Sequence, residues 1–221
     1  EDIETAVAFD NTQYIRDSID EVQQTIFLAF GLVVIIIFMF LRDWRTTFIP
    51  VITVPISLIG TFFIMYILGF SVNVLTLLGI VLAIGLVVDD SIVVLENIYT
   101  KIEGGEQPKV AGKKGTEEIF FAVISTTIAL VSVFFPIVFL QGLTGRLFRE
   151  FGITLAGAVV ISSFVALTLA PMLSSRLLKK REKKQWIYEV TEPFFIWLNQ
   201  KYKNALDAFM KRKWVAGVLI V

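Results

Sequence analysis

Long apolar runs, separated by short charged segments, constrain this chain more than any other feature of its sequence. Five runs contain no Lys, Arg, Asp or Glu, and they cover residues 22–41, 46–68, 70–88, 119–140 and 151–175. A helix needs about 20 apolar residues to cross the hydrocarbon core of a bilayer. The runs therefore predict an all-α membrane protein with five complete transmembrane helices. Buried helices of a large soluble protein are the alternative that these runs disfavour.

Composition excludes several other classes of protein. The chain has no His and no Cys, which removes disulfides, zinc–thiolate sites, imidazole metal sites and Ser-His-Asp triads. Its 20 basic and 20 acidic residues cancel, so the whole chain has no net attraction to nucleic acid. Any proton or ion chemistry must therefore use carboxylates, amines, hydroxyls and the backbone.

The distribution of Lys and Arg predicts the orientation. If successive loops alternate across the membrane, seventeen of the twenty basic residues fall on one side. The other side holds Arg16, Arg146 and Arg149. Since basic residues accumulate in cytoplasmic loops, we expect a periplasmic N-terminus and a cytoplasmic segment over residues 176–213. In a Gram-negative cell this places the protein in the inner membrane.

The same patterns divide the chain into four predicted parts. Residues 1–21 are the end of a periplasmic domain, with a β-like stretch at Thr5–Phe9 and an outward extension of the first helix. Residues 22–175 form the five-helix bundle, and residues 176–213 form a cytoplasmic linker. A further span begins at Trp214, within residues 214–221, so we expect this sequence to be a piece of a larger protein.

The cytoplasmic linker contains an amphipathic helix. Apolar side chains recur at Leu198, Tyr202, Leu206 and Phe209, with polar residues between them, and Pro193 marks a possible helix start. Lys-rich flanks and such a face are typical of a helix that lies in the membrane interface. Packing of this face against the same protein is the alternative.

Two adjacent carboxylates, Asp89 and Asp90, lie close to the centre of the third predicted helix, which we expect from about Asn73 to Thr100. A charge at this depth costs at least about 2.5–3.5 kcal/mol on insertion scales. Intramembrane carboxylates mainly serve ion or proton pathways. An interhelical hydrogen bond that supports assembly is the alternative.

Small or polar residues share the helical faces of the two carboxylates. Gly85 and Glu96 lie on the face of Asp89, and Ala83 and Asn97 lie on the face of Asp90. These neighbours predict that both carboxylates face protein rather than lipid, although close helix packing alone also explains the small residues. No span contains Lys or Arg. If the aspartates ionise, a cationic partner must therefore come from outside this sequence; otherwise they are protonated for much of the time.

Prolines and small residues indicate how the helices bend and pack. We expect a bend at Pro50 and Pro55. Pro136 lies inside the fourth span and Pro171 lies near the end of the fifth, and each frees a backbone carbonyl that protein or water must satisfy. A small-residue face on the fifth span comprises Gly152, Gly157, Ser162, Ser163 and Ala166.

The segment from Gly85 to Asn97 resembles the fourth transmembrane helix of resistance–nodulation–division (RND) efflux pumps, including their Gly-x-x-x-Asp pattern. Residues 41–50 resemble the turn after the second helix of these pumps. Residues 135–148 resemble the end of the fifth helix, and residues 151–154 and 169–173 resemble the sixth. The resemblance covers nearly the whole chain and agrees in order.

This resemblance implies the N-terminal half of the membrane domain of a drug-exporting proton antiporter, which is a transporter and not an enzyme. Asp89 and Asp90 would be the proton-relay pair, partnered by a Lys and an Arg from the second half of the polypeptide. The resemblance further implies a homotrimer, a periplasmic adaptor, an outer-membrane channel, and no cofactor beyond the proton gradient. The fragment alone is not expected to transport.

Three other functions remain as alternatives. A non-transporting receptor or structural relative in the same superfamily could share the fold. A channel would need a ring of acids or carbonyls around a pore. An intramembrane aspartyl protease would need its two carboxylates on facing helices, whereas here they are neighbours on one.

Overall fold

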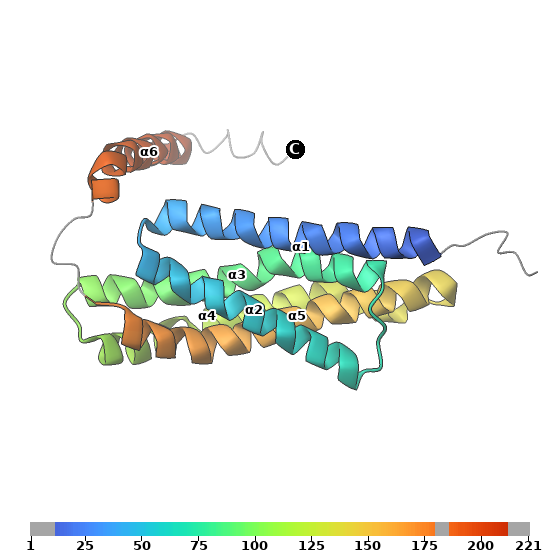
Figure 1. Ribbon diagram of the computed structural model, residues 1–221. Helices are drawn as coiled ribbons and strands as arrows, with labels where there is room; N and C mark the ends of the chain where they lie inside the picture. The colour runs from blue at the N-terminus through green and yellow to red at the C-terminus, as the bar shows by residue number, and fades with distance from the viewer. Residues whose placement is uncertain (1–11, 180–185, 212–221) are drawn as a thin grey trace, which may run out of the picture. The chain divides into compact units, whose positions relative to one another are not determined.

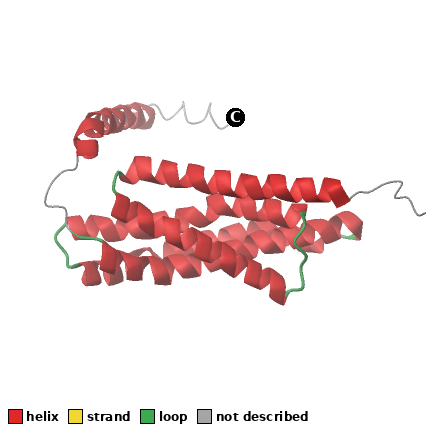
Figure 2. Cartoon of the chain, viewed as in Figure 1, coloured by secondary structure: helices red, strands yellow, loops and turns green. Residues whose placement is uncertain are grey.

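The computed structural model describes residues 12–179 and 186–211, and all regular structure in these ranges is helical (Figure 2). The first compact unit ends at Lys180 and the second begins at Arg181. The first unit contains α1 (Thr12–Leu41), α2 (Trp44–Ile67), α3 (Val74–Glu103), α4 (Pro108–Phe134), the 3₁₀ helix η1 (Phe135–Phe139) and α5 (Gly142–Leu177). The second contains α6 (Trp186–Lys211).

The prediction of an all-α membrane protein is confirmed. Five helical segments within the described residues are long and apolar enough to cross a bilayer. Figure 1 shows these helices running side by side along the bundle. The first helix begins at Thr12, ten residues before the apolar run at Val22, which confirms that the helix extends beyond that run.

A two-residue connection joins α1 to α2. Arg42 adopts a left-handed conformation with φ of 52°, and its amide donates to the carbonyl oxygen of Phe38 at 2.8 Å. Asp43 is buried, and its carboxylate accepts a hydrogen bond from the Thr46 hydroxyl at 2.6 Å. The chain therefore reverses direction within two residues, and α1 and α2 pack as an antiparallel pair.

Local signals at both ends define α3. The Asn73 side chain accepts from the amide of Thr76, and the Thr76 hydroxyl accepts from the amide of Asn73, which completes a capping box. The helix ends at Glu103 before two glycines, of which Gly105 has φ of 99°. The expected helix at 73–100 is confirmed to within three residues, and its centre falls at the aspartate pair.

Helix α3 is the centre of the first unit, because it packs against α1, α2, α4 and α5. Its side chains Ile80, Ala83, Ile84 and Val87 are almost completely buried. Helix α5 lies against α3 through small residues, and Ala158 and Ala166 are inaccessible to solvent. A Cβ at Gly157 would lie 3.3 Å from Ile64 of α2, so the predicted small-residue face does permit close packing.

Two predicted span boundaries differ from the structure. Helix α4 begins at Pro108 rather than near Ile119, and α5 begins at Gly142 rather than near Phe151. Both helices include charged residues beyond their apolar runs, because a helix can continue into polar sequence where the bilayer no longer limits its composition. Hydropathy therefore located the spans but not the helix ends.

The prolines have different effects. Pro50 and Pro55 lie inside α2, and Pro171 lies inside α5. The α-helix does not continue through Pro136: α4 ends at Phe134, and Phe135–Phe139 form η1. A proline lacks the amide for the helical hydrogen bond, and a short 3₁₀ turn accommodates this loss.

In the second unit, the predicted helix start at Pro193 is wrong, because α6 begins at Trp186. Proline removes one backbone hydrogen bond without necessarily ending a helix. The apolar side chains of Trp197, Leu198, Tyr202 and Leu206 are exposed in this unit, and the amphipathic character of the helix stays a prediction. Contact of this face with a membrane stays a prediction. The expected features at Thr5–Phe9 and Trp214 lie outside the described residues.

Candidate functional site

Asp89 and Asp90 lie in the middle of α3 and line a groove between α3 and α4 with a volume of about 410 Å³. Asp89 is exposed and Asp90 is partly buried. Apart from the two carboxylates and Thr126, the groove is apolar. Its lining residues are Leu86, Asp89, Asp90, Val93, Ala122, Val123, Thr126, Ala129 and Leu130.

The opposite side of the same helical turn is held by hydroxyl groups from two neighbouring helices. The Thr53 hydroxyl of α2 donates to Ser91 Oγ at 3.0 Å, and both side chains are buried. The Ser162 hydroxyl of α5 donates to the carbonyl oxygen of Val87 at 2.8 Å. The backbone that carries the aspartates is therefore hydrogen-bonded on the side of α3 that faces α2 and α5, while the carboxylates lie on the side that lines the groove with α4.

The two faces predicted around the aspartates have different surroundings. Ala83 is fully buried, and Asp90 and Asn97 are partly buried, so this face does contact protein. Gly85, Asp89 and Glu96 are exposed. Nothing lies within 4 Å of the position that a Cβ at Gly85 would take. The expectation that both carboxylates face protein therefore differs from the structure at Asp89, whose enclosure by further protein stays a prediction.

Asn97, which lies on the face of Asp90 and was expected to support helix packing or water access, contacts α4. Its side-chain amide donates to the carbonyl oxygen of Gly115 at 2.7 Å and to Glu118 at 3.3 Å. Lys101 forms an ion pair with the same glutamate at 2.7 Å. Asn97 therefore joins α3 to α4 near the basic end of the bundle, two turns from the aspartates.

The aspartate pair forms no ion pair within residues 12–179 and 186–211. Ion pairs in these ranges include Lys101–Glu118, Lys113–Glu117 and Lys114–Glu106, all near the connection between α3 and α4. The same ranges contain no group of three side chains suited to bind a metal. The described part of the chain thus supplies two carboxylates but no basic partner for them.

Sequence reasoning missed the hydroxyl residues that hold the aspartate turn. Thr53, Ser57 and Thr61 recur every four residues along α2, and all three are buried. Ser57 and Thr61 each donate to the carbonyl of the residue four positions earlier. This spacing of polar residues inside an apolar run was the available signal. It marks a face that packs against protein, but it does not identify the partner on another helix.

Five membrane-length helices, with a carboxylate pair on the central one, define a polytopic helical membrane protein with an ionisable site in its bundle. Comparison with known sequences makes the class more specific. The chain belongs to the AcrB/AcrD/AcrF family, whose sequence profile matches residues 1–221. The resemblance to RND efflux pumps is thereby confirmed at the level of the family.

Three curated relatives illustrate the match. The chain is 48% identical over 208 residues to an uncharacterized transporter of Haemophilus influenzae. The aligned region covers 94% of this chain and 20% of that protein. It is 49% identical over 183 residues to multidrug resistance protein MdtC of Pectobacterium atrosepticum, and the aligned region covers 83% of this chain and 18% of that protein. It is 44% identical over 220 residues to MdtC of Yersinia pestis, and the aligned region covers 99% of this chain and 22% of that protein. The chain thus spans about a fifth of each relative.

Proposed function

We propose that this chain is part of a proton-driven drug exporter of the inner membrane, and that Asp89 and Asp90 are its proton-relay pair. The exporter is a secondary active transporter that exchanges protons for drugs and uses no cofactor beyond the proton gradient. The names of the relatives support drug export, since two of the proteins described above are multidrug resistance proteins. The fragment by itself is not expected to transport.

The position of the aspartate pair carries this proposal. Both residues lie mid-way along a membrane-length helix, beside an apolar groove and without a basic neighbour in the described chain. A permanently charged pair at such a site would be costly, whereas a pair that binds and releases protons is charged only when a partner compensates it. We propose that a Lys and an Arg from the rest of the polypeptide supply this compensation.

The surrounding contacts support a link between protonation and movement. Helix α3 touches four other helices, and the Thr53 and Ser162 hydroxyls fix its aspartate turn from behind. Gain or loss of charge would therefore change how a basic partner packs on the exposed face of Asp89, while the opposite face of α3 stays bonded to α2 and α5.

In the proposed assembly, a homotrimer works with a periplasmic adaptor and an outer-membrane channel.

The first test replaces each aspartate by asparagine in the full-length transporter that carries these residues. We expect Asp89→Asn and Asp90→Asn each to abolish dye efflux driven by a pH gradient, because asparagine cannot exchange a proton. The readout is dye efflux from proteoliposomes with a matched amount of protein. Asp20→Asn is the matched control, since Asp20 is an exposed carboxylate of α1 away from the groove.

Three outcomes would count against the proposal or against the assay. Efflux that survives both substitutions would leave the pair with a structural role. Loss of efflux in the Asp20 control as well would mean that the assay reports general damage. A correctly assembled wild-type protein that moves no substrate under a proton gradient would instead favour the non-transporting receptor or structural relative.

A further inference from the structure

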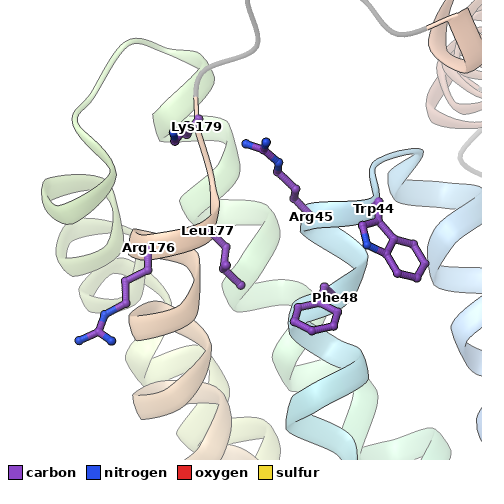
Figure 3. Close-up of a pocket in the computed structure, with 6 residues that line it drawn as sticks. All are labelled: Trp44, Arg45, Phe48, Arg176, Leu177 and Lys179. Carbon is purple, nitrogen blue, oxygen red and sulfur yellow. The ribbon is translucent and has the colours of Figure 1, made fainter.

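A second cleft lies where α2 begins and α5 ends, at the end of the bundle opposite the α2–α3 connection. Its volume is about 390 Å³. Figure 3 shows the six residues that line it: Trp44, Arg45, Phe48, Arg176, Leu177 and Lys179. Three of the six are basic and none is acidic. The family assignment and the proposed proton relay leave this cleft unexplained.

The basic side chains of the cleft have no partners in the described chain. Within residues 12–179, Arg45, Arg176 and Lys179 form no ion pair or hydrogen bond. Elsewhere at this end of the bundle, Lys101 and Lys114 are each paired with a glutamate. The cleft is therefore a local excess of positive charge rather than part of an internal ion-pair network.

The cleft combines this charge with an apolar floor. In Figure 3 the guanidinium of Arg45 extends from α2 toward the space between α2 and α5, above Phe48 and Leu177. Lys179 lies just past the end of α5 without extending toward Arg45, and Arg176 points away from the space. Trp44 is 68% exposed and Phe48 is 40% exposed at the start of α2. Tryptophan prefers the level of the lipid headgroups. The cleft thus presents donors at one level and apolar surface directly beside them.

We propose that this cleft binds the headgroup phosphate of an anionic phospholipid such as phosphatidylglycerol. Arg45 and Lys179 would donate to the phosphate oxygens, and the acyl chains would pass along Phe48 and Leu177. Basic pockets between transmembrane helices are suited to anionic headgroups. The assignment to the cytoplasmic leaflet rests on the proposed orientation, whereas the recognition chemistry does not.

Charge complementarity favours an external anion over the chain's own continuation. The residues that follow Lys179 are Lys180, Arg181, Glu182, Lys183 and Lys184, which carry four positive charges and one negative charge. Such a segment would add to the positive charge of the cleft instead of compensating it. A free phosphate ion shares the headgroup chemistry, but it would leave the apolar floor unused.

The test measures lipid binding to the full-length transporter in detergent by native mass spectrometry. The protein is mixed with equal amounts of phosphatidylglycerol and phosphatidylcholine. We expect wild-type protein to retain phosphatidylglycerol preferentially and Arg45→Gln/Lys179→Gln to lose that preference. Lys109→Gln/Lys113→Gln is the matched control, because it removes two exposed charges from the same end of the bundle, outside the cleft.

A charge-conserving variant and a phosphate arm make the outcomes decisive. Arg45→Lys/Lys179→Arg should keep the preference, which separates lost binding from misfolding. Equal binding by wild type and Arg45→Gln/Lys179→Gln would overturn the proposal, as would an equal loss in the control. If inorganic phosphate displaces the lipid completely at equimolar concentration, the site takes the free ion and the lipid assignment is wrong.

The lipid measurement is independent of transport. It needs no proton gradient, and we expect Asp89→Asn to bind phosphatidylglycerol as wild type does. A transporter that binds the lipid but ignores the gradient would contradict only the proton relay. One that pumps protons but shows no lipid preference would contradict only the lipid site.

Discussion

At the scale of single residues, the turn from Val87 to Ser91 has different chemistry on its two sides. Ser91 and the carbonyl of Val87 bind hydroxyls of α2 and α5, and these bonds involve no formal charge. Asp89 and Asp90 lie on the groove side, where charge can change. Substitutions of the hydroxyl residues on the side facing α2 and α5 should therefore alter stability, whereas substitutions of the aspartates on the groove side should alter proton coupling.

The Thr53–Ser91 hydrogen bond can be measured by a double-mutant cycle. We expect Thr53→Val and Ser91→Ala to show a coupling of about 0.6 kcal/mol, the average for hydrogen bonds between transmembrane helices. Unfolding of the full-length protein in detergent provides the free energies. Thr61→Val is the control, because the Thr61 hydroxyl bonds only within α2 and should be additive with Ser91→Ala. Additivity of Thr53→Val with Ser91→Ala would remove the proposed contact.

At the scale of helices, α3 and α4 approach closely at Gly115. A Cβ at this position would lie 2.9 Å from Ile98 Cγ1 and 3.1 Å from the Ile98 Cα. Since the Cα belongs to the backbone of α3, the two helices would have to separate, and the Asn97 bond to Gly115 would be strained. This contact depends on glycine for space rather than for an unusual φ.

We expect Gly115→Ala to destabilise the protein by about 1–3 kcal/mol, as overpacking of a well-packed interface does. Gly31→Ala is the matched control, because nothing lies within 4 Å of its added Cβ. In a helix interior that change should stabilise by about 0.5–1 kcal/mol. Thermal unfolding in detergent distinguishes the two. A Gly115→Ala protein as stable as the Gly31→Ala protein would mean that the helices separate at no cost.

Helix positions were predictable from the sequence to the extent that the signals were local. The apolar runs located five spans, and the helix expected from about Asn73 to Thr100 agrees with α3 to within three residues at each end. The early start of α5 was not predictable from hydropathy, because Arg146 and Arg149 interrupt the apolar pattern while the helix continues through them.

The aspartate pair was identifiable because two adjacent carboxylates in an apolar span are conspicuous. Its supporting contacts were not, since Thr53 and Ser91 are 38 residues apart and Ser162 and Val87 are 75 apart. Such bonds depend on how the helices rotate and pack against each other, and one sequence does not specify that. For the same reason, the sequence placed Asn97 on the face of Asp90 but did not identify α4 as the helix that it contacts.

At the scale of the whole molecule, the uneven distribution of basic residues predicts an orientation that cysteine labelling can test. The chain contains no cysteine, so single cysteines can be introduced into a full-length transporter freed of its others. Lys113 is exposed near the start of α4 and Arg146 near the start of α5, which are at opposite ends of the bundle. We expect a membrane-impermeant maleimide added to intact spheroplasts to label Arg146→Cys and to spare Lys113→Cys until the membrane is opened.

Permeabilised membranes provide the control, since both cysteines should then react. Labelling of Lys113→Cys in intact spheroplasts would reverse the proposed orientation. It would also move the lipid site to the periplasmic leaflet without changing its chemistry.

The central position of the aspartates also bears on how this protein is made. A helix leaves the translocon for the bilayer when its residues favour lipid, and each Asp near the centre opposes this by about 2.5–3.5 kcal/mol. Among the five membrane-length helices, α3 alone carries such a pair at its middle. Its hydroxyl contact with α2 is available as soon as both segments have been synthesised, whereas the contact with Ser162 must wait for α5. Integration of α3 into the bilayer should therefore depend on α1 and α2, which are synthesised just before it. The order of synthesis thus contributes to assembly of the aspartate site.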